Sequence, residues 1–361
     1  MTLAKVLRVL KLTLRVDVPA TRIRPIGRGY NNDLFIVDHD EFKVVHHKPQ
    51  QAGTVPPASG AKTVVVRLLK TALDGLLERT ENEVAALSLV RGPLHKVVHV
   101  PKIYAWSTTA DEFPFIIMEH LEGVPLDTIW PTLDLPARLL IVQQIATILK
   151  TLQSIPSPTS VDTFGGLSFT PSGDITTSMH PDGLGGPFSS AHAQWLSMLT
   201  LRLRDAEANS VIEGWKANGL RDRIEAFVAS HKFSAIINQA ATEPVFVHGD
   251  FNCRNMLVSP DTHKITGLLD FEFARIDTAP EELMDGLEDF RGHTCLQPPP
   301  KGLQLHLLDA KSSWPCQRDD YSLALSDGCQ IALAWKDAFR IDGPEYDATA
   351  RAYSFLENLC P

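Results

Sequence analysis

The chain has 361 residues, which is enough for roughly two domains or lobes of ordinary size. Apolar residues make up 44% of it and charged residues 21%, as is usual for a soluble globular protein. With 34 basic and 43 acidic residues the net charge is −9, so we expect no nucleic-acid-binding surface, whereas a cationic substrate is compatible with this charge.

The five cysteines are scattered and form no C-x-x-C pair, which argues against a zinc site or a disulfide framework and favours a reducing compartment. No apolar run approaches the roughly 20 residues that span a membrane. The N-terminal segment MTLAKVLRVLKLTLRV has four basic residues before its first acid, and its apolar residues recur at helical spacing. This pattern predicts an amphipathic first helix packed on the fold. A mitochondrial transit peptide is the alternative, but the segment lacks serine, so we expect a cytoplasmic protein.

Residues 23–48 alternate in the manner of two strands joined by the glycine turn GRGYNN. Residues 48–62 are rich in Pro, Gly and Ala and predict a loop, which we expect to be mobile. A short buried strand follows at 63–70, and then a helix that Gly92-Pro93 should stop. Two more strand-like runs, VVHVPKIYAWS and FPFIIMEHL, complete the first 120 residues. This order predicts a small antiparallel sheet with one inserted helix.

The chain becomes helical after residue 120. Apolar residues at three- and four-residue spacing predict a core helix over 135–155. Residues 156–190 are too long for a plain connector and are therefore functional or partly disordered. Further helices are expected at 191–208, 220–240, 321–340 and 344–359. The fold class is accordingly α+β, with an N-terminal lobe over 1–120 and a larger, mostly helical lobe over 121–361.

The glycine turn GRGYNN carries G-x-G at Gly27 and Gly29, but Asn32 stands where a third glycine would complete the dinucleotide-binding motif. That motif also needs a helix directly after the turn, and a strand follows here. A turn between antiparallel strands can instead cover the phosphates of a nucleotide with its backbone N–H groups, which would place Gly27, Gly29 and Asn31 against the cofactor. An ordinary hairpin turn is the alternative.

Arg67 is a lone cation in the apolar strand VVVRLL. A buried, unpaired cation is costly, so we expect a carboxylate partner on the next helix, either Glu81 or Glu83. Such a pair could direct the guanidinium at phosphate oxygens, although a structural salt bridge would account for it equally well.

The most specific pattern is H-x-D-x-x-x-x-N, formed by His248, Asp250 and Asn255, with Asp270 following in D-F-E after a predicted hairpin. This spacing suits phosphoryl transfer. One carboxylate can accept the proton of a substrate hydroxyl, while an amide and a second carboxylate can hold the magnesium ions that neutralise the transferring phosphate.

From Ile23 to Asp289 the chain resembles the aminoglycoside phosphotransferase and choline kinase-like family, of the protein-kinase-like fold, and especially its fungal members of unassigned substrate. The resemblance is carried, in the family's order, by the segments GYNNDLFIV, VVVRLLK, NEVAALSLV, VPKIYAW, IIMEHLEGVPL, HGDFNCRN and LLDFEFA. Together these motifs are specific to the family, but they say little about the substrate.

The resemblance implies a role for each site residue. Asp250 corresponds to the catalytic base, His248 to the residue that braces its loop, and Asn255 and Asp270 to the metal ligands. Arg67 stands in the place of the family's phosphate-binding lysine, which is a departure, and Glu83 in that of its helix partner. The segment from Met118 to Leu121, including Glu119, corresponds to the hinge whose backbone binds a purine base.

These features together predict a kinase that uses ATP and Mg²⁺ to phosphorylate a hydroxyl of a small molecule similar to an aminoglycoside, choline or another metabolite. Six acids between 277 and 289 could grip an amine on such a substrate, unless they form a solvated helix face. A catalytically weak pseudokinase serving as a nucleotide-binding scaffold is the alternative, motivated by Arg67 and the incomplete glycine motif. Protein phosphorylation fits less well, because the H-G-D form and the absence of an A-P-E segment favour small-molecule kinases.

Overall fold

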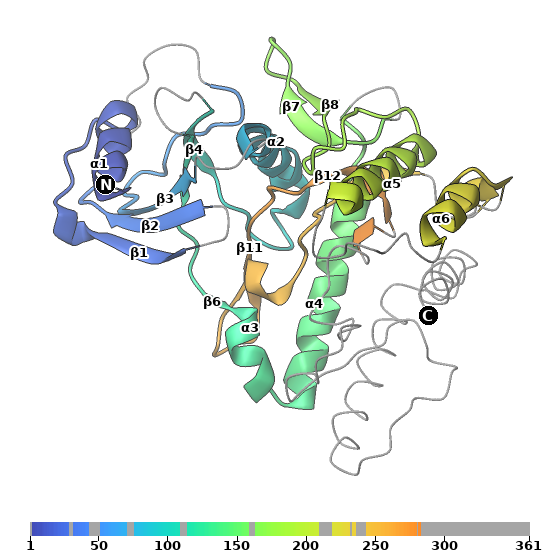
Figure 1. Cartoon of the computed structure of the whole chain (residues 1–361). Helices are drawn as coiled ribbons and strands as arrows, with labels where there is room; N and C mark the ends of the chain where they lie inside the picture. The colour runs from blue at the N-terminus through green and yellow to red at the C-terminus, as the bar shows by residue number, and fades with distance from the viewer. Residues whose placement is uncertain are drawn as a thin grey trace.

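The computed structural model describes residues 2–28, 32–42, 51–70, 76–108, 114–158, 163–208, 219–231, 233–235, 243–279 and 281–282. The helices predicted at 321–340 and 344–359 lie outside these residues, as do Gly29 and Asn31 of the glycine turn. Among the residues described, no helix is long and apolar enough to cross a membrane. Figure 1 shows a small sheet-containing lobe next to a larger one that is mostly helical.

The small lobe is built on a five-stranded antiparallel sheet, as the sequence predicts, and its strand order is β1-β2-β3-β5-β4. Its strands, in chain order, are β1 (Ile23–Arg28), β2 (Asn32–Asp38), β3 (Thr63–Leu69), β4 (Ile103–Ser107) and β5 (Phe115–Glu119). The β-branched and aromatic residues of these runs suit a pleated, largely buried surface. Arg67 lies in the central strand β3, opposite Leu34 of β2 and Ile116 of β5.

Helices cover both faces of this sheet. Helix α1 (Thr2–Thr13) buries its apolar stripe, including Val6, Val9 and Leu10, in one core with residues of β2, β3 and β5. Helix α2 (Leu76–Leu94) joins a second core, shared with β4 and with the larger lobe. It continues through Pro93, beyond the predicted stop at Gly92, because Val90 and the fully buried Leu94 hold its last turn in that core. The sheet is therefore tied to the larger lobe through α2.

The described part of the predicted loop, residues 51–62, packs on the sheet without regular secondary structure. Val55 donates its backbone N–H to Ile103 O (2.8 Å), and Trp106 Nε1 donates to Ala52 O (2.9 Å). Gly53 has φ +77°, and a Cβ there would meet Val84 Cγ1 at 2.5 Å. The Pro- and Gly-rich composition thus produces a loop that is closely fitted against β4 and α2.

The larger lobe begins with β6 (Val124–Pro125), α3 (Leu126–Ile129) and the predicted core helix α4 (Leu135–Gln153). Asp134 caps α4 by accepting a hydrogen bond from the Ala137 N–H (2.9 Å), and Pro136 is tolerated in the first turn. The predicted helices at 191–208 and 220–240 are α5 (Ala191–Ala208) and the shorter α6 (Leu220–Val228).

The long connector at 156–190 contains an antiparallel hairpin, β7 (Gly166–Phe169) and β8 (Ile175–Ser178), that docks on α2. Asn82 Oδ1 accepts a hydrogen bond from the Leu167 N–H (2.6 Å), and Glu81 Oε1 accepts one from the Phe169 N–H (2.9 Å). Asn82 Nδ2 also donates to Glu272 O and Ala274 O. The hairpin therefore helps to fix α2 beside the D-F-E segment.

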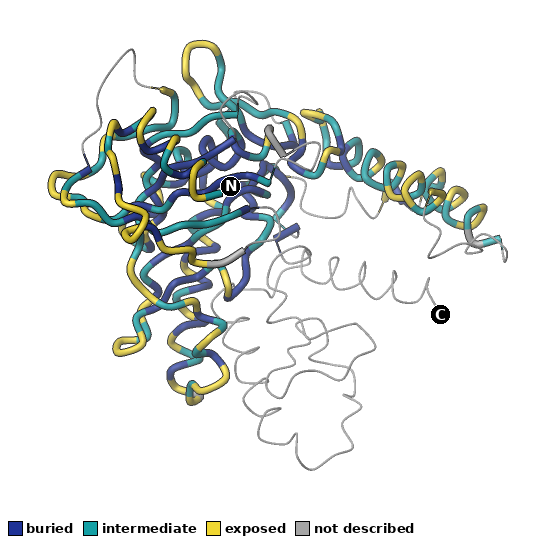
Figure 2. The backbone as a smooth tube through the Cα atoms, turned by 60° about the vertical axis from the view of Figure 1, so that its left-hand side comes forward, coloured by how far each residue is buried: buried dark blue, intermediate teal, exposed yellow. Residues whose placement is uncertain are grey.

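Two short ladders position the polar motifs. Strand β9 (Pro244–Val247) pairs with β12 (Arg275–Thr278), and β10 (Met256–Val258) pairs with β11 (Ile265–Leu268). Residues 248–255 leave β9 and residues 269–274 enter β12, so both polar segments lie at the same end of these strands. Most residues of these four strands are buried, and Figure 2 shows that buried backbone, drawn dark blue, makes up the interior of the molecule.

Candidate active site

His248 braces the loop that follows β9. It is fully buried between the rings of Phe251 and Phe271, with centroids 5.7 and 4.4 Å away. Its Nδ1 lies 3.3 Å from the Asp250 N–H and its Nε2 lies 3.1 Å from Leu269 O. Burial lowers the pKa of His248 to about 3, so the ring is neutral, with Nδ1 accepting and Nε2–H donating. It thereby joins the H-G-D loop to the residue before Asp270.

We expect this neutral histidine to make stability depend on pH. Its pKa in the folded state, about 3, lies below the ordinary value of 6.5, so the unfolded chain binds one more proton between these pH values. The contribution of His248 to the free energy of unfolding should be fully present above pH 6.5. Below pH 6.5 the free energy of unfolding should fall by up to about 1.4 kcal/mol per pH unit. His248→Gln should flatten the decline of the melting temperature between pH 6.5 and 4.5, whereas His95→Gln, at an exposed site, should leave it unchanged. Equal slopes for all three proteins would contradict this role.

Asp250 is held by two asparagine side chains. Asn252 Nδ2 donates to Asp250 Oδ1 (2.5 Å), and Asn255 Nδ2 donates to Asp250 Oδ2 (2.7 Å). Asn252 Oδ1 in turn accepts hydrogen bonds from the backbone N–H groups of Arg254 and Asn255. The carboxylate is thus fixed in orientation in its acceptor form. The role of Asn252 escaped the sequence analysis, although an asparagine that hydrogen-bonds the backbone two residues ahead is typical of a tight turn.

The carboxylate of Glu282 fixes the backbone of the same loop. Glu282 Oε2 accepts a hydrogen bond from the His248 N–H (2.5 Å), and Oε1 accepts one from the Gly249 N–H (3.1 Å). Gly249 has φ +77°, and a Cβ there would lie 2.4 Å from Phe273 O. Only glycine fits this position without strain. Glu282 therefore fixes the backbone directly before Asp250.

From the sequence, the acids at 277–282 were expected either to form a solvated helix face or to bind an amine, and the structure shows neither role. Asp277 and Glu282 are completely buried and Glu281 is 6% exposed. Arg275, also buried, pairs with Asp277 (2.6 Å) and Glu281 (3.5 Å). These three acids stabilise the larger lobe internally, and the remaining three, beyond residue 282, lie outside the described residues.

Replacement of Glu282 by glutamine should weaken the fold and the loop together. The amide supplies one acceptor oxygen where two backbone N–H groups need partners, and its own NH₂ faces the other donor. A buried unsatisfied donor costs about 1–3 kcal/mol, so we expect a free energy of unfolding lower by that amount. Urea titration of Glu282→Gln measures it, with Glu122→Gln, at an exposed site, as the control. An unchanged urea midpoint would show that the two hydrogen bonds accepted by Glu282 contribute nothing to stability.

Arg67 lies among three carboxylates. Its Nη1 is 2.5 Å from Glu83 Oε2 and 3.3 Å from Asp270 Oδ1, and its Nη2 is 2.5 Å from Glu272 Oε2. Of the two predicted partners, Glu83 is the one observed, while Glu81 caps the hairpin backbone instead. Glu272 was missed, although it is the third residue of the D-F-E motif. Asn32 also reaches this group, because its Nδ2 lies 3.3 Å from Glu272 Oε2.

This buried group contains more negative than positive charge. One guanidinium faces three carboxyl groups, and the side chains of Arg67, Glu83 and Glu272 are each at most 6% exposed. Burial raises the pKa of Glu83 to about 8, against the opposing effect of Arg67, but even when Glu83 is protonated the carboxyl groups of Asp270 and Glu272 outnumber the one guanidinium. The guanidinium is engaged with acids on both Nη atoms, so its first role in this structure is to balance charge. A divalent cation beside Asp270 would supply the positive charge that the group lacks.

Asn255 and Asp270 fit a magnesium ion. Asn255 uses its Nδ2 on Asp250, which leaves its side-chain oxygen as the possible ligand, and its backbone O accepts a hydrogen bond from the Leu269 N–H (2.8 Å). Asp270 follows directly, at φ +63°, and its side chain is 35% exposed. In the described ranges no three His, Cys, Asp or Glu side chains converge as a metal cage. Magnesium rarely uses one, since it takes one or two protein ligands together with water and phosphate oxygens.

The nucleotide-binding residues that the resemblance implies lie at two places. Gly27 sits at a bulge in β1, opposite Leu34, where the glycine turn begins. At the end of β5, Glu119 pairs with Lys102 (3.0 Å). The backbone N–H of Leu121 makes no hydrogen bond within the described part of the chain. A purine base could use this donor.

Comparison with known proteins shows the family. Residues 22–296 match the model of the phosphotransferase enzyme family, which is well over half of the chain. The chain belongs to this family.

One solved structure similar to this phosphotransferase is that of the aminoglycoside phosphotransferase APH(2")-IIa in complex with gentamicin. The two structures have a TM-score of 0.56 and 16% sequence identity, and the match covers 99% of this chain and 88% of that one. APH(2")-IIa in its ternary complex with streptomycin and ATP has a TM-score of 0.55, at 15% identity and the same coverage. APH(4)-Ia with ADP and hygromycin B has a TM-score of 0.52, at 14% identity, covering 98% of this chain and 89% of that one.

At these identities the likeness shows the fold alone, which is the α+β protein-kinase-like fold expected from the sequence. A search of curated proteins finds no significant match. The phosphotransferase family and its fold are therefore established for this chain, while its substrate is not.

Proposed function

We propose that this phosphotransferase uses ATP and Mg²⁺ to phosphorylate a hydroxyl group of a small molecule. The observation that carries the proposal is the Asp250 carboxylate, held by Asn252 and Asn255 next to a pair of magnesium-suited ligands. A carboxylate fixed in this way can accept the proton of an incoming hydroxyl. Similar proteins of this fold bind ATP or ADP together with an aminoglycoside, which supports a nucleotide and a hydroxylated acceptor here.

The remaining assignments combine this geometry with the roles that the family resemblance implies. His248 and Glu282 would keep the loop rigid, and Asn255 and Asp270 would hold Mg²⁺, which supplies the charge that neutralises the transferring phosphate. Gly27, Gly29 and Asn31 would cover the phosphates, and the Glu119–Leu121 backbone would bind the base. We also propose a boundary between the lobes at residues 120–121, since β5 is the last strand of the sheet and β6 pairs with β10.

The test is a screen for ADP formation with ATP, Mg²⁺ and a library of hydroxylated metabolites, amines, sugars and antibiotics. The proposal expects at least one acceptor that raises ADP formation well above the rate without acceptor. A pseudokinase scaffold is the second candidate, because three carboxylates engage Arg67 and could keep it from phosphate. Tight nucleotide binding without turnover on any acceptor would favour that candidate.

Asp270→Ala should weaken the part of nucleotide binding that depends on magnesium and leave the magnesium-independent part unchanged. If Asp270 is a metal ligand, its loss should weaken Mg²⁺-dependent ATP binding by at least about tenfold, since even groups that only support a ligand contribute that much. Binding measured by calorimetry in EDTA should change little. Asp261→Ala, on the exposed turn between β10 and β11, is the control. Equal Mg²⁺-dependent affinities for wild type and Asp270→Ala would refute the metal role.

A further inference from the structure

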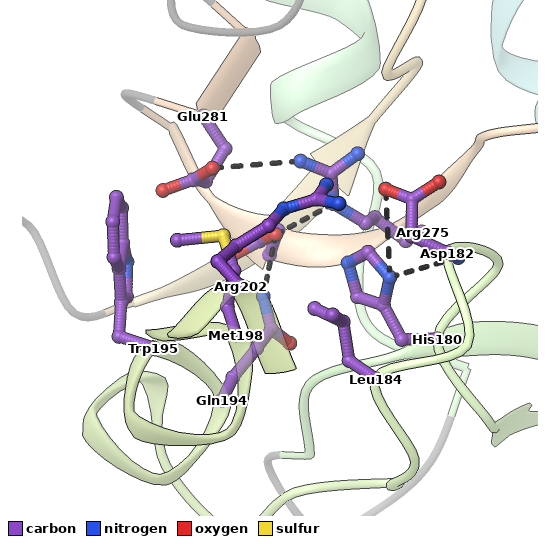
Figure 3. Close-up of a pocket in the computed structure, with 10 residues that line it drawn as sticks. His180, Asp182, Leu184, Gln194, Trp195, Met198, Arg202, Arg275 and Glu281 are labelled. Atoms are coloured by element: carbon purple, nitrogen blue, oxygen red, sulfur yellow. Dashed lines mark hydrogen bonds and ion pairs between the residues drawn. The ribbon is translucent and has the colours of Figure 1, made fainter. Parts of the chain in front are cut away.

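A pocket in the larger lobe lies beside the candidate active site and has no assigned role. Three segments line it: the loop at 180–184, one face of α5, and the residues from β12 to the start of the next helix. Figure 3 shows their side chains converging from these segments. Its cavity volume is about 50 Å³, within about 390 Å³ of space partly open to solvent. The inner part has room for one small polar group and the outer part for the rest of a ligand.

The pocket adjoins the loop of Asp250. Arg275 at its base lies under Gly249, because a Cβ on Gly249 would be 2.8 Å from Arg275 Nη1. Gly249 directly precedes Asp250. A molecule that contacts Arg275 in this pocket would therefore lie one side chain away from the backbone that precedes the proposed catalytic base.

Most charges of the pocket are already paired. Arg275 pairs with Asp277 and Glu281. Asp182 pairs at 3.5 Å with Arg79, a residue that does not line the pocket. The acids are therefore compensated by arginines, and no carboxylate of the lining is left to attract an amine by itself.

Arg202 is the exception. It is exposed on α5, and among the residues described it makes no ion pair or hydrogen bond. It stands on the same helix face as Gln194 and Met198, four residues apart in each case, so it reaches over the opening of the pocket. Its guanidinium is thus a positive charge available to a ligand.

His180 adds a second donor. Its Nδ1 accepts a hydrogen bond from the Asp182 N–H (3.1 Å), and in Figure 3 its other ring nitrogen, Nε2, points into the pocket. Burial, together with Arg275, Arg79 and Arg202, lowers the pKa of His180 to about 2. The ring is therefore neutral and carries its proton on Nε2, and its 3.9 Å approach to the Asp182 carboxylate is not an ion pair. The charges that lower the pKa of this ring, those of Arg275, Arg79 and Arg202, are all positive.

Gln194 contributes a hydrogen-bond acceptor to the pocket. It is only 4% exposed, and its Nε2 donates to Asp277 Oδ2 (2.7 Å). Its Oε1 is buried without a hydrogen-bond partner. A buried acceptor left unpaired is costly, so this atom requires a donor such as a ligand hydroxyl. Trp195 and Met198 supply apolar wall beside it.

We propose that this pocket binds the acceptor of the phosphotransferase and that the acceptor is an anionic, hydroxylated small molecule. Its carboxylate or phosphate group meets Arg202 and the Nε2–H of His180, and one of its hydroxyls donates to Gln194 Oε1. Another hydroxyl extends past Arg275 toward Asp250. The inference rests on the proposed function and replaces the expectation of a cationic substrate.

The test uses compounds that differ mainly in charge. Glycerate and glycerol 3-phosphate are compared with glycerol and 3-amino-1,2-propanediol, and glucuronate with glucose and glucosamine. Binding at millimolar concentration is measured by ligand-observed NMR without nucleotide, and ADP formation is measured separately with ATP and Mg²⁺. The variants are Arg202→Gln, Arg202→Lys, and Arg204→Gln as a control on the same helix.

We expect the anions to bind in preference to their neutral and cationic counterparts. Arg202→Gln should weaken this binding roughly tenfold or more, with partial recovery in Arg202→Lys and no change in Arg204→Gln. The carboxylate and phosphate arms show which anion the pocket prefers. Equal or better binding of the amines, no binding of any anion, or no effect of Arg202→Gln overturns the inference. Anion binding that depends on Arg202 but never leads to ADP formation would leave the pocket assigned and refute the proposed function.

Discussion

Replacement of Asp250 by asparagine should reduce acceptor-dependent ADP formation by a factor of about 10²–10⁴ while leaving nucleotide binding measurable. The side chain keeps its size but can no longer accept a proton. It also loses one of the two acceptor oxygens that Asn252 and Asn255 engage, so two amide NH₂ groups come to face each other. A modest loss of stability should therefore accompany the loss of turnover.

Steady-state kinetics and calorimetry of nucleotide binding, at a temperature well below the melting transition of the variant, distinguish these effects. Asp261→Asn removes a carboxylate from an exposed turn later in the same part of the chain and should behave as wild type. Wild-type turnover in Asp250→Asn would eliminate Asp250 as the base. A simultaneous loss of nucleotide affinity and of the folded state would instead assign it a structural role.

Replacement of Arg67 by alanine should produce the largest loss of stability. It leaves Glu83 and Glu272 buried without their common cation, and removing one partner of a buried ion pair costs about 3–5 kcal/mol. Arg67→Lys should recover only part of this, because a single ammonium cannot reproduce contacts made by two separate guanidinium nitrogens. Chemical denaturation measures the free energy of unfolding for each variant.

A second substitution tests the cause. If the loss in Arg67→Ala comes from unbalanced negative charge, then adding Glu83→Gln should restore part of the stability, although Glu83→Gln alone removes a contact of Arg67. Lys70→Ala, just after the same strand, is the matched control and should change stability by less than about 1 kcal/mol. Additive effects of the two substitutions would show that Arg67 and Glu83 are not energetically coupled.

The sequence was sufficient to predict the features that local patterns encode. Strand and helix periodicity gave the five-stranded sheet, α2 and α4, and the fixed spacing of His248, Asp250 and Asn255 singled out the loop that the structure builds around one carboxylate. A partner for Arg67 at Glu81 or Glu83 could be anticipated, because a cation in a buried strand needs a carboxylate from the next element, and the structure shows that it is Glu83.

What escaped prediction depends on contacts between distant parts of the chain. Glu282 lies 34 residues after the backbone that it fixes, and Asn32 meets Glu272 across 240 residues. The acids at 277–282 were misinterpreted for a physical reason. A run of carboxylates is usually solvated, but here β12 pairs with β9 in a register that buries Arg275, and Asp277 and Glu281 are drawn in with it. No periodicity in the sequence distinguishes such compensated acids from exposed ones.

The central claim is that the phosphoryl group passes from ATP to a hydroxyl of a small molecule at Asp250. Its most direct test is ³¹P NMR of the protein with ATP, Mg²⁺ and the acceptors that raise ADP formation, with Asp250→Asn in parallel. We predict that a phosphate-ester resonance grows in step with ADP in the wild-type reaction and is absent with Asp250→Asn. Release of inorganic phosphate alone, or the same ester formed by both proteins, would contradict the account.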